Sequence, residues 1–422
     1  METVMEIAQK AKEASCVLGL ASLELRNGAL SQMALCLRED LPLILAANAE
    51  DVAAAQAKGT KESLVDRLAL DESRIEGIAS ALESLRDLPD VLGVVQQHRS
   101  LYNGVDLKRV TVPLGVIAMV YEARPNVTAD AAGICVKTGN ACILRGGSMA
   151  FNSCMAITNS LRRALELVGL PANCVQMIQT ADREATDELL HARGLVDLLI
   201  PRGGAGLISH CVEHATVPII ETGTGNCHVY VEKSADLTMA LPILMNSKCR
   251  RYGVCNACET LLVDRDIAAQ FLPLAFASLK EKGVLIHGDQ EACAIAASCG
   301  LEEGMNYLEA TEADWETEYL APELAVRVVD GEEQAIEHIN RYGTMHSEAI
   351  VTSDEDAANL FRQLVDASSV YVNAATAFTD GGEFGMGAEL GISTQKIHAR
   401  GPFALEALTS YKYLLTGTGQ VR

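Results

Sequence analysis

Apolar residues recur at helical spacing through the first part of the chain, with charged residues between them. In residues 1–20, 28–37 and 41–57 the apolar positions repeat every three or four residues, and Ala, Glu and Lys fill the opposite positions. This pattern predicts three amphipathic helices. Because such a helix buries one face, we expect these three to serve in packing.

Near residue 103 the helical spacing gives way to alternation of apolar and polar positions. The segment 101–110 alternates about Asn103-Gly104, a pair typical of the tight turn of a β-hairpin. A second alternating segment, 407–416, carries Tyr411 and Tyr413 near the C-terminus. Exposed strand edges recruit partners, so we expect this tail to pair with the hairpin of the same or another subunit.

Short β-branched runs alternate with longer helical stretches over the rest of the chain. The strands predicted in the first series are 115–121, 141–144, 175–178, 196–200 and 218–220. Those predicted in the second series are 259–263, 284–286, 324–329, 349–351 and 370–373, with helices such as 267–282 and 333–341 between them. This alternation predicts βαβ units, mostly parallel sheets, and small-molecule sites beyond the carboxyl ends of the strands.

Length and composition limit the class of protein. A chain of 422 residues is too long for one core of ordinary size, so we expect two domains or one large split domain. A content of 49% apolar and 21% charged residues is typical of globular proteins. The net charge of −22 argues against nucleic acids and anionic membranes as partners. No signal-like or membrane-spanning segment is evident, so we expect a cytoplasmic protein.

One loop carries the strongest chemical signal. Residues 248–263 join a predicted helix to a predicted strand through a loop with Cys255. Gly253 leaves room for the backbone, and Arg250 and Arg251 supply positive potential that favours a thiolate. Cys255 is therefore our candidate nucleophile. The alternative is that Cys255 is a small buried apolar residue, as free cysteines usually are. The chain has 13 cysteines.

Two short motifs suggest other chemistry. Cys255 and Cys258 form C-x-x-C, which fits a redox pair or half of a zinc site, but no second ligand pair accompanies it. His210 and His214 form H-x-x-E-H without an identifiable third ligand, and a solvated helix face explains them equally. We therefore predict no metal site, and we expect reduced thiols rather than disulfides.

Five longer motifs occur along the chain and resemble a known family. They are Tyr121-Glu-Ala-Arg-Pro-Asn-Val-Thr128, Leu144-Arg-Gly-Gly-Ser148, Glu221-Thr-Gly-Thr-Gly-Asn-Cys-His228, Arg251-Tyr-Gly-Val-Cys-Asn256 and His338-Ile-Asn-Arg-Tyr-Gly-Thr-Met-His-Ser-Glu348. Their sequences and order resemble the aldehyde dehydrogenase superfamily and, more narrowly, its gamma-glutamyl phosphate reductase family. Tyr252 and Cys258 depart from that family, which usually has proline and a small residue there.

The resemblance implies a fold and a division of the chain. We expect an α/β protein with two Rossmann-like domains and a small β element for oligomerisation. The implied segments are 1–100 and 112–227 for the cofactor domain with 375–405 returning to it, 228–374 for the catalytic domain, and 101–111 with 406–422 for the β element. A homodimer or homotetramer follows, with functional coupling to a glutamate kinase.

The resemblance also implies the reaction. It is the NADPH-dependent reduction of L-glutamyl 5-phosphate to L-glutamate 5-semialdehyde plus phosphate, a step of proline biosynthesis, through a thioester on Cys255. Asn126 matches the residue that stabilises the oxyanion, although a helix-capping residue is its alternative. Glu221 matches the general base of hydrolytic relatives, and in this chain it is either structural or involved in proton handling.

Four residues match cofactor-binding positions of the family. Arg145 and Ser148 match positions near the adenosine ribose, and a guanidinium with a hydroxyl accommodates the 2′-phosphate of NADP. Gly204, in a short glycine-rich loop, would approach the pyrophosphate at a helix N-terminus. Glu318 matches the residue that binds the nicotinamide-side ribose, with a surface ion pair as its alternative.

Two other functions remain open from the sequence. A hydrolytic or CoA-linked aldehyde dehydrogenase would use the same thiol, and phosphate dependence separates it from the reductase. A non-catalytic relative would bind the cofactor without turnover. The glycine-rich loop 376–386 is expected to line the substrate site.

Overall fold

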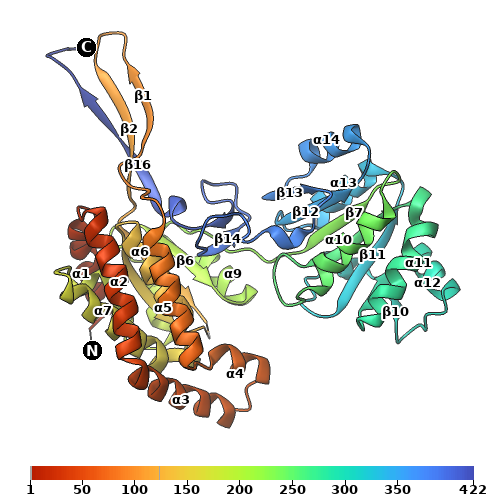
Figure 1. Cartoon of the computed structure of the whole chain (residues 1–422), viewed down its shortest axis with the longest axis horizontal. Helices are drawn as coiled ribbons and strands as arrows, with labels where there is room; N and C mark the ends of the chain where they lie inside the picture. The colour runs from red at the N-terminus through yellow and green to blue at the C-terminus, as the bar shows by residue number, and fades with distance from the viewer. Residues whose placement is uncertain (1, 123) are drawn as a thin grey trace. The chain divides into compact units, whose positions relative to one another are not determined.

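The computed structural model describes residues 2–122 and 124–422, and it forms two compact units (Figure 1). The first unit contains the chain up to Thr222, together with Met386–Gly391 and Phe403–Arg422. The second contains Gly223–Gly385 and Ile392–Pro402. Each unit is built around its own parallel sheet, so each has its own core.

Five helices open the first unit. They are α1 (Val4–Leu18), α2 (Leu23–Glu39), α3 (Leu41–Ala57), α4 (Glu62–Leu68) and α5 (Glu72–Asp87). The three predicted helices are confirmed as α1 to α3. The first begins at a capping box, in which Thr3 accepts the N–H of Glu6 and the Glu6 carboxylate accepts the N–H of Thr3.

The sheet of the first unit has four parallel strands in the order β5-β4-β3-β6. Their bounds are β3 (Val116–Tyr121), β4 (Ala141–Gly146), β5 (Val175–Met177) and β6 (Leu198–Arg202). The crossover segments are α6 (Asn126–Lys137), η1 (Ser148–Ala150), α7 (Phe151–Leu167), η2 (Ala172–Cys174), α8 (Arg183–Leu190) and α9 (Ala205–His214). Helices cover both faces, and for this reason β3 and β4 are buried throughout.

The prediction of a strand at 218–220 is wrong. This segment forms only an isolated bridge, between Leu199 and Ile219. Pro218 has no backbone N–H to donate to a ladder, and a proline therefore limits strand pairing.

The sheet of the second unit has seven parallel strands in the order β10-β9-β11-β8-β7-β12-β13. The strands are β7 (Cys227–Val231), β8 (Cys258–Asp264), β9 (Leu285–Gly288), β10 (Tyr307–Glu309), β11 (Glu323–Val329), β12 (Ser347–Val351) and β13 (Ser369–Val372). The helical segments are α10 (Leu237–Cys249), α11 (Arg265–Glu281), α12 (Gln290–Ser298), η3 (Glu312–Glu316), α13 (Glu332–Tyr342), α14 (Glu355–Leu364) and η4 (Thr376–Phe378). Residues of α10, α11 and α12 pack on one face of the sheet, and residues of α13 and α14 pack on the other.

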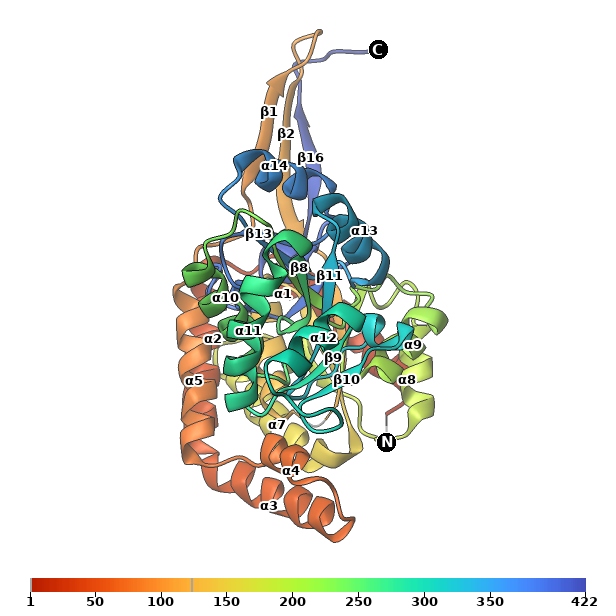
Figure 2. The same cartoon turned by 90° about the vertical axis from the view of Figure 1, so that its right-hand side faces the viewer.

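A three-stranded antiparallel sheet belongs to the first unit. It consists of β1 (Val95–Ser100), β2 (Asp106–Pro113) and β16 (Thr409–Thr416), and it projects away from the helices of that unit (Figure 2). The predicted hairpin is confirmed, with Gly104 at φ +82° in its turn. The predicted tail strand is also confirmed, since β16 pairs with β2 of the same chain from Thr409↔Pro113 to Thr416↔Asp106.

The remaining elements are short. They are β14 (Gly391–Ser393), β15 (Gly401–Phe403) and η5 (Glu406–Leu408), and the two strands form a sheet of their own. Among the described residues, no helix is long and apolar enough to cross a membrane.

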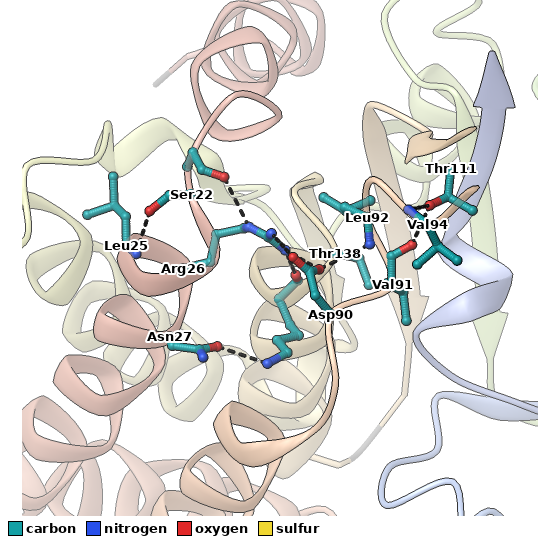
Figure 3. A network of polar contacts seen from close by, with 12 residues as sticks. Ser22, Leu25, Arg26, Asn27, Asp90, Val91, Leu92, Val94, Thr111 and Thr138 are labelled. Carbon is teal, nitrogen blue, oxygen red and sulfur yellow. Dashed lines mark hydrogen bonds and ion pairs between the residues drawn. The ribbon is translucent and has the colours of Figure 1, made fainter. Parts of the chain in front are cut away.

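A buried arginine ties the helices of the first unit to the hairpin (Figure 3). Arg26 of α2 donates to both carboxylate oxygens of Asp90, at 3.2 and 2.7 Å, and to the carbonyl oxygens of Ala21 and Lys137. Lys137, at the end of α6, donates to Asn27 Oδ1 and to the Arg86 carbonyl, both at 2.8 Å. The network therefore joins α2, α5, α6 and the segment that leads into β1.

Replacing Arg26 with methionine should strongly destabilise the first unit. The change leaves Asp90 without its cation and two carbonyl groups without a donor, a loss of about 3–5 kcal/mol for a broken buried pair. Urea unfolding of the whole chain, followed by circular dichroism, measures the shift. Arg163→Met is the matched control, because this arginine is 41% exposed and pairs with Glu39 at the surface, where a pair contributes at most about 1 kcal/mol. Equal shifts for both variants would contradict the assignment.

Candidate active site

Cys255 lies on the loop between α10 and β8, as predicted, and it is half-buried. The loop is closed by a hydrogen bond from the Ala257 N–H to the Val254 carbonyl, at 3.1 Å. From β7 the Cys227 thiol donates to the Cys255 carbonyl, at 3.2 Å. Both Arg250 and Arg251 are exposed at the start of the loop.

Gly225 packs directly against the Cys255 peptide. A Cβ atom at position 225 would lie 1.5 Å from the Cys255 carbonyl oxygen and 2.7 Å from its Cα atom. Only glycine permits this approach, since real Cβ contacts of this length do not occur. The segment before β7 therefore supports the backbone of the loop that carries the candidate nucleophile.

The next residue, Asn256, anchors the loop on its other side. Its amide nitrogen donates to the carbonyl oxygens of Ala377 and Thr379, at 3.2 and 3.0 Å. In return the Thr376 hydroxyl donates to the Asn256 carbonyl, at 2.7 Å. The start of the predicted substrate loop, 376–386, thus clamps the residue that follows Cys255.

The second cysteine of the C-x-x-C motif has a different environment. Cys258 is fully buried at the start of β8, and its thiol donates to the Thr260 carbonyl at 3.3 Å. Burial raises the pKa of the Cys258 thiol well above its usual range. Burial likewise raises the pKa of Cys227. Both residues are therefore held as neutral thiols, which are poor nucleophiles.

Glu318 also belongs to the surroundings of this loop. Its Oε1 atom accepts the N–H of Gly225 at 2.7 Å, so this carboxylate holds the glycine that supports Cys255. Burial raises the pKa of Glu318, because the surroundings disfavour its charged form. Glu318, which the sequence predicts at the cofactor ribose, therefore also accepts a hydrogen bond from within the protein.

In the first unit the ends of three strands meet at one edge of the sheet. Tyr121 of β3 pairs with Gly146 of β4 and with Arg202 of β6, so the segments that follow these strands start side by side. Asn126, Ser148 and Gly204 lie within these segments. This edge is where ligands bind in parallel α/β sheets.

Asn126 is the first residue of α6 and is exposed. One hydrogen of its amide is donated to the Asp130 carboxylate, at 3.1 Å. Burial raises the pKa of Asp130 to about 6, opposed by this hydrogen bond. Because the Asn126 side chain is exposed, the second hydrogen of its amide is accessible to a ligand.

The two residues expected near the adenosine ribose differ in exposure. Ser148 begins η1 and is exposed. Arg145 is buried, and its guanidinium donates to the carbonyl oxygens of Gly146, Ala181 and Asp182, at 3.2, 2.8 and 3.1 Å. Arg145 therefore holds the segment before α8, and Ser148 is the residue of the two that faces solvent.

Gly204 is the N-cap of α9, and its N–H is accepted by the Glu122 carboxylate at 3.0 Å. An anionic oxygen thus already binds at the start of this helix, as expected for a helix N-terminus. Sequence reasoning missed Glu122, although it lies inside the motif that begins at Tyr121. Glu221 is half-buried next to Thr222, whose hydroxyl donates to the Pro201 carbonyl.

The H-x-x-E-H motif lies on α9. His210 Nε2 pairs with the Asp187 carboxylate at 2.7 Å, and its ring stacks on that of His214 at 4.5 Å. Within residues 2–122 and 124–422, no group of three His, Cys, Asp or Glu residues is arranged to hold a metal ion.

Comparison with known proteins first defines the class. A model described as the aldehyde dehydrogenase family matches residues 1–300. The same fold occurs in an acetylating aldehyde dehydrogenase from Geobacillus thermoglucosidasius, with a TM-score of 0.69 and 21% identity over 99% of this chain and 97% of that one. The class of this protein, with its two parallel α/β units, is therefore the aldehyde dehydrogenase family.

Closer relatives define the group within that class. Gamma-glutamyl phosphate reductases of Moorella thermoacetica and Thermobifida fusca are 53% and 51% identical, over 100% and 99% of this chain and 100% and 98% of theirs. The crystal structure of the reductase from Thermotoga maritima matches with a TM-score of 0.97 and 44% identity over 100% of both chains. The chain therefore belongs to the gamma-glutamyl phosphate reductases of the aldehyde dehydrogenase family.

Replacing Gly225 with alanine should reduce turnover at least about 100-fold, because the added methyl group must displace the Cys255 peptide by more than about 1 Å. The measurement is the steady-state rate of nicotinamide-linked turnover. Gly77→Ala is the matched control. Gly77 lies in α5 with nothing within 4 Å of the added Cβ atom, so this change should leave turnover intact and stabilise by roughly 0.5–1 kcal/mol. If the Gly225→Ala variant turned over at the wild-type rate, Gly225 would not be needed to support the Cys255 peptide.

Proposed function

We propose that the chain reduces L-glutamyl 5-phosphate to L-glutamate 5-semialdehyde and phosphate with NADPH, a step of proline biosynthesis. The observation that carries the proposal is the held backbone of the loop that presents Cys255. Gly225 supports its peptide, Asn256 anchors the next residue, and neighbouring Cys258 is kept neutral by burial. A soft nucleophile presented in this way suits attack on an acyl phosphate.

The first chemical step is the formation of a thioester. The Cys255 thiolate attacks the acyl carbon, a C–S bond forms, and the C–O bond to phosphate breaks with release of inorganic phosphate. Asn126 keeps one amide hydrogen for the oxyanion of the tetrahedral intermediate, and Asp130 orients the amide through the other hydrogen. The exposed Arg250 and Arg251 supply guanidinium groups suited to phosphate oxygens.

The second step is the reduction of the thioester, and the family uses a nicotinamide cofactor for it. The residues fit such a group, because the Gly204 N–H at the start of α9 already donates to a carboxylate oxygen, which a pyrophosphate oxygen would replace. Gly206 has nothing within 4 Å of a Cβ position, which leaves that helix turn open. When bound, the cofactor supplies the hydride that releases the aldehyde from Cys255.

The preference for NADP rests on Ser148 more than on Arg145. Ser148 is exposed at the strand end and would donate a hydrogen bond to the 2′-phosphate. The Arg145 guanidinium is already bonded to three carbonyl groups, so it would act by positive charge and by holding the 181–182 segment. Glu318 would accept hydrogen bonds from the nicotinamide-side ribose through the oxygen that Gly225 does not use.

The remaining assignments concern organisation. The first unit would bind the cofactor, the second would carry the chemistry, and β1, β2 and β16 would build a homodimer or homotetramer. A functional coupling to a glutamate kinase would limit the loss of the labile acyl phosphate. We place the enzyme in the cytoplasm, where a catalytic thiol stays reduced.

Phosphate dependence tests the reaction against its rival. Oxidation of glutamate 5-semialdehyde should produce NADPH only with phosphate or arsenate, because the Cys255 thioester is released by an oxyanion and not by water. Cys255→Ala should lower this rate at least about 1,000-fold, whereas Cys258→Ala should change it little, since the removed thiol is neutral. Undiminished activity without either anion would indicate a hydrolytic aldehyde dehydrogenase with Glu221 as its base. CoA dependence would indicate a CoA-linked enzyme.

Replacing Ser148 with glutamate should weaken the binding of NADPH much more than the binding of NADH. A carboxylate near the 2′-phosphate adds charge repulsion and removes a hydrogen bond, so we expect the KM for NADPH to rise roughly 10- to 100-fold. Steady-state KM values for both cofactors provide the measurement. The Ser148→Ala variant, which removes only the hydroxyl group, is the control and should show the smaller effect of losing the hydrogen bond alone. Equal rises in KM for the two cofactors would argue against a contact between Ser148 and the 2′-phosphate.

Removal of β16 should dissociate the assembly. Both outer strands of the three-stranded sheet are exposed, from Val95 to Ser100 and over most of 409–416, and exposed edges promote pairing between chains. Light scattering should show a smaller mass for the chain that lacks residues 409–422. The chain that lacks only 417–422, beyond β16, is the control and should keep its mass. An unchanged mass for both truncations would reject this role.

A further inference from the structure

The strand that follows Cys255 contains a β-bulge. In the ladder between β7 and β8, Cys227 pairs with Cys258, but the next residue, His228, pairs with Thr260. Glu259 is thus the extra residue of β8. A bulge redirects a side chain and is common next to functional sites.

The redirected carboxylate is completely buried and has two partners. Lys248, in the last turn of α10, places its ammonium group against Glu259 Oε2, and neither side chain has any exposed surface. The other oxygen, Oε1, accepts the N–H of Leu320 at 3.3 Å. Burying two charges is expensive, and apolar residues of the same size are usually at least as stable. Stability alone therefore does not account for this pair.

The segment that Glu259 holds is the one that carries Glu318. Leu320 has a φ of +52°, a left-handed conformation that is unusual for a leucine. Tyr319 donates its hydroxyl to Asp314 at 2.8 Å and stacks on His287 at 4.9 Å. The Lys248 ammonium group lies 6.0 Å from the centre of the Tyr319 ring. Residues 318–320 are therefore fixed from several sides.

These contacts close a ring around the nucleophile's loop. Glu259 holds Leu320, and two residues earlier Glu318 accepts the N–H of Gly225. Gly225 packs on the Cys255 peptide. The loop itself starts from Lys248, which returns to Glu259. Glu259 is thus linked through these contacts to both Glu318 and Cys255.

We propose that Glu259 is a positioning residue, which holds the Glu318 carboxylate and the Cys255 peptide in register. The essential element is the acceptor that Glu259 offers to the Leu320 N–H, and Lys248 supplies the charge that allows a carboxylate to be buried there. The proposal rests on the proposed function for the role of Glu318 and Cys255 in turnover, while the ring itself lies entirely within the second unit.

Two double variants separate positioning from stability. Lys248→Met with Glu259→Leu removes both charges and the acceptor, whereas Lys248→Met with Glu259→Gln removes the charges and keeps an acceptor oxygen. In the leucine variant the apolar replacements should keep the unfolding midpoint near that of the wild type. Its kcat/KM for NADPH should nevertheless fall about 10- to 100-fold, as expected for misplaced groups. The glutamine variant should stay within about threefold of wild type.

A second readout does not depend on turnover. The rate at which iodoacetamide alkylates Cys255, followed by mass spectrometry, should differ from wild type by at least about fivefold in the leucine variant and by less than about twofold in the glutamine variant. Arg265→Met is the control. Its exposed pair with Asp330 lies at the other end of β8, and both readouts should be unchanged.

The outcomes are distinct. Wild-type kcat/KM and alkylation in the leucine variant would show that the pair is only structural, and equal losses in the two double variants would overturn the role of the acceptor. If the wild-type protein itself lacked reductase activity, the proposed function would fail. The alkylation rates would still show whether Glu259 positions Cys255. If the leucine variant unfolded below the assay temperature, loss of stability would account for its defect, and the pair would be assigned a structural role only.

Discussion

The active-site loop depends on one close backbone approach, the contact between Gly225 and the Cys255 peptide. No side chain fits between the two segments, so the position of Cys255, the candidate nucleophile, is set by the path of the chain before β7. A loop that carries a nucleophile is usually the mobile part of a fold. In this protein main-chain packing holds the loop, so Cys255 keeps a defined place although it lies on a connection between elements.

Buried polar groups extend this constraint through the second unit. Asn226 donates to the carbonyl oxygens of Trp315 and Tyr342, and Asn256 donates to those of Ala377 and Thr379. Each amide bridges segments far apart in the sequence, and each would be costly to leave unpaired. The unit thus uses hydrogen bonds to loops, rather than apolar packing alone, to hold the surroundings of Cys255.

In the first unit the regular geometry of the parallel sheet brings three segments of the chain to one edge. Because β3, β4 and β6 are in register, the segments that follow them begin at one edge, and these segments carry Asn126, Ser148 and Gly204. The Arg26 network fixes the far end of α6, the helix that starts at Asn126. The start of α9, where the Gly204 N–H donates to a carboxylate, and the exposed Asn126 amide thus lie in the segments that follow these strands.

Local patterns were sufficient for much of the fold. Buried β-branched runs, helical spacing and the Asn103-Gly104 turn each depend on neighbours in the sequence, so the helices α1 to α3, the hairpin and most strands could be predicted. The segment 218–220 has the composition of a strand, yet its proline and its place at the sheet edge leave one bridge. The short strand β10 was missed because two of its three residues are exposed and show no apolar pattern.

The sequence by itself determined the class of fold, the family and the identity of Cys255 as the candidate nucleophile, because long motifs and periodicity are local properties. Only the tertiary structure decided which partners the other groups have. The Arg145 guanidinium bonds carbonyl groups of residues 181–182, and Glu318 accepts the Gly225 N–H across 93 positions of the chain. The bulge at Glu259 depends on the register between β7 and β8, which is a property of two paired strands and cannot be read from either strand alone.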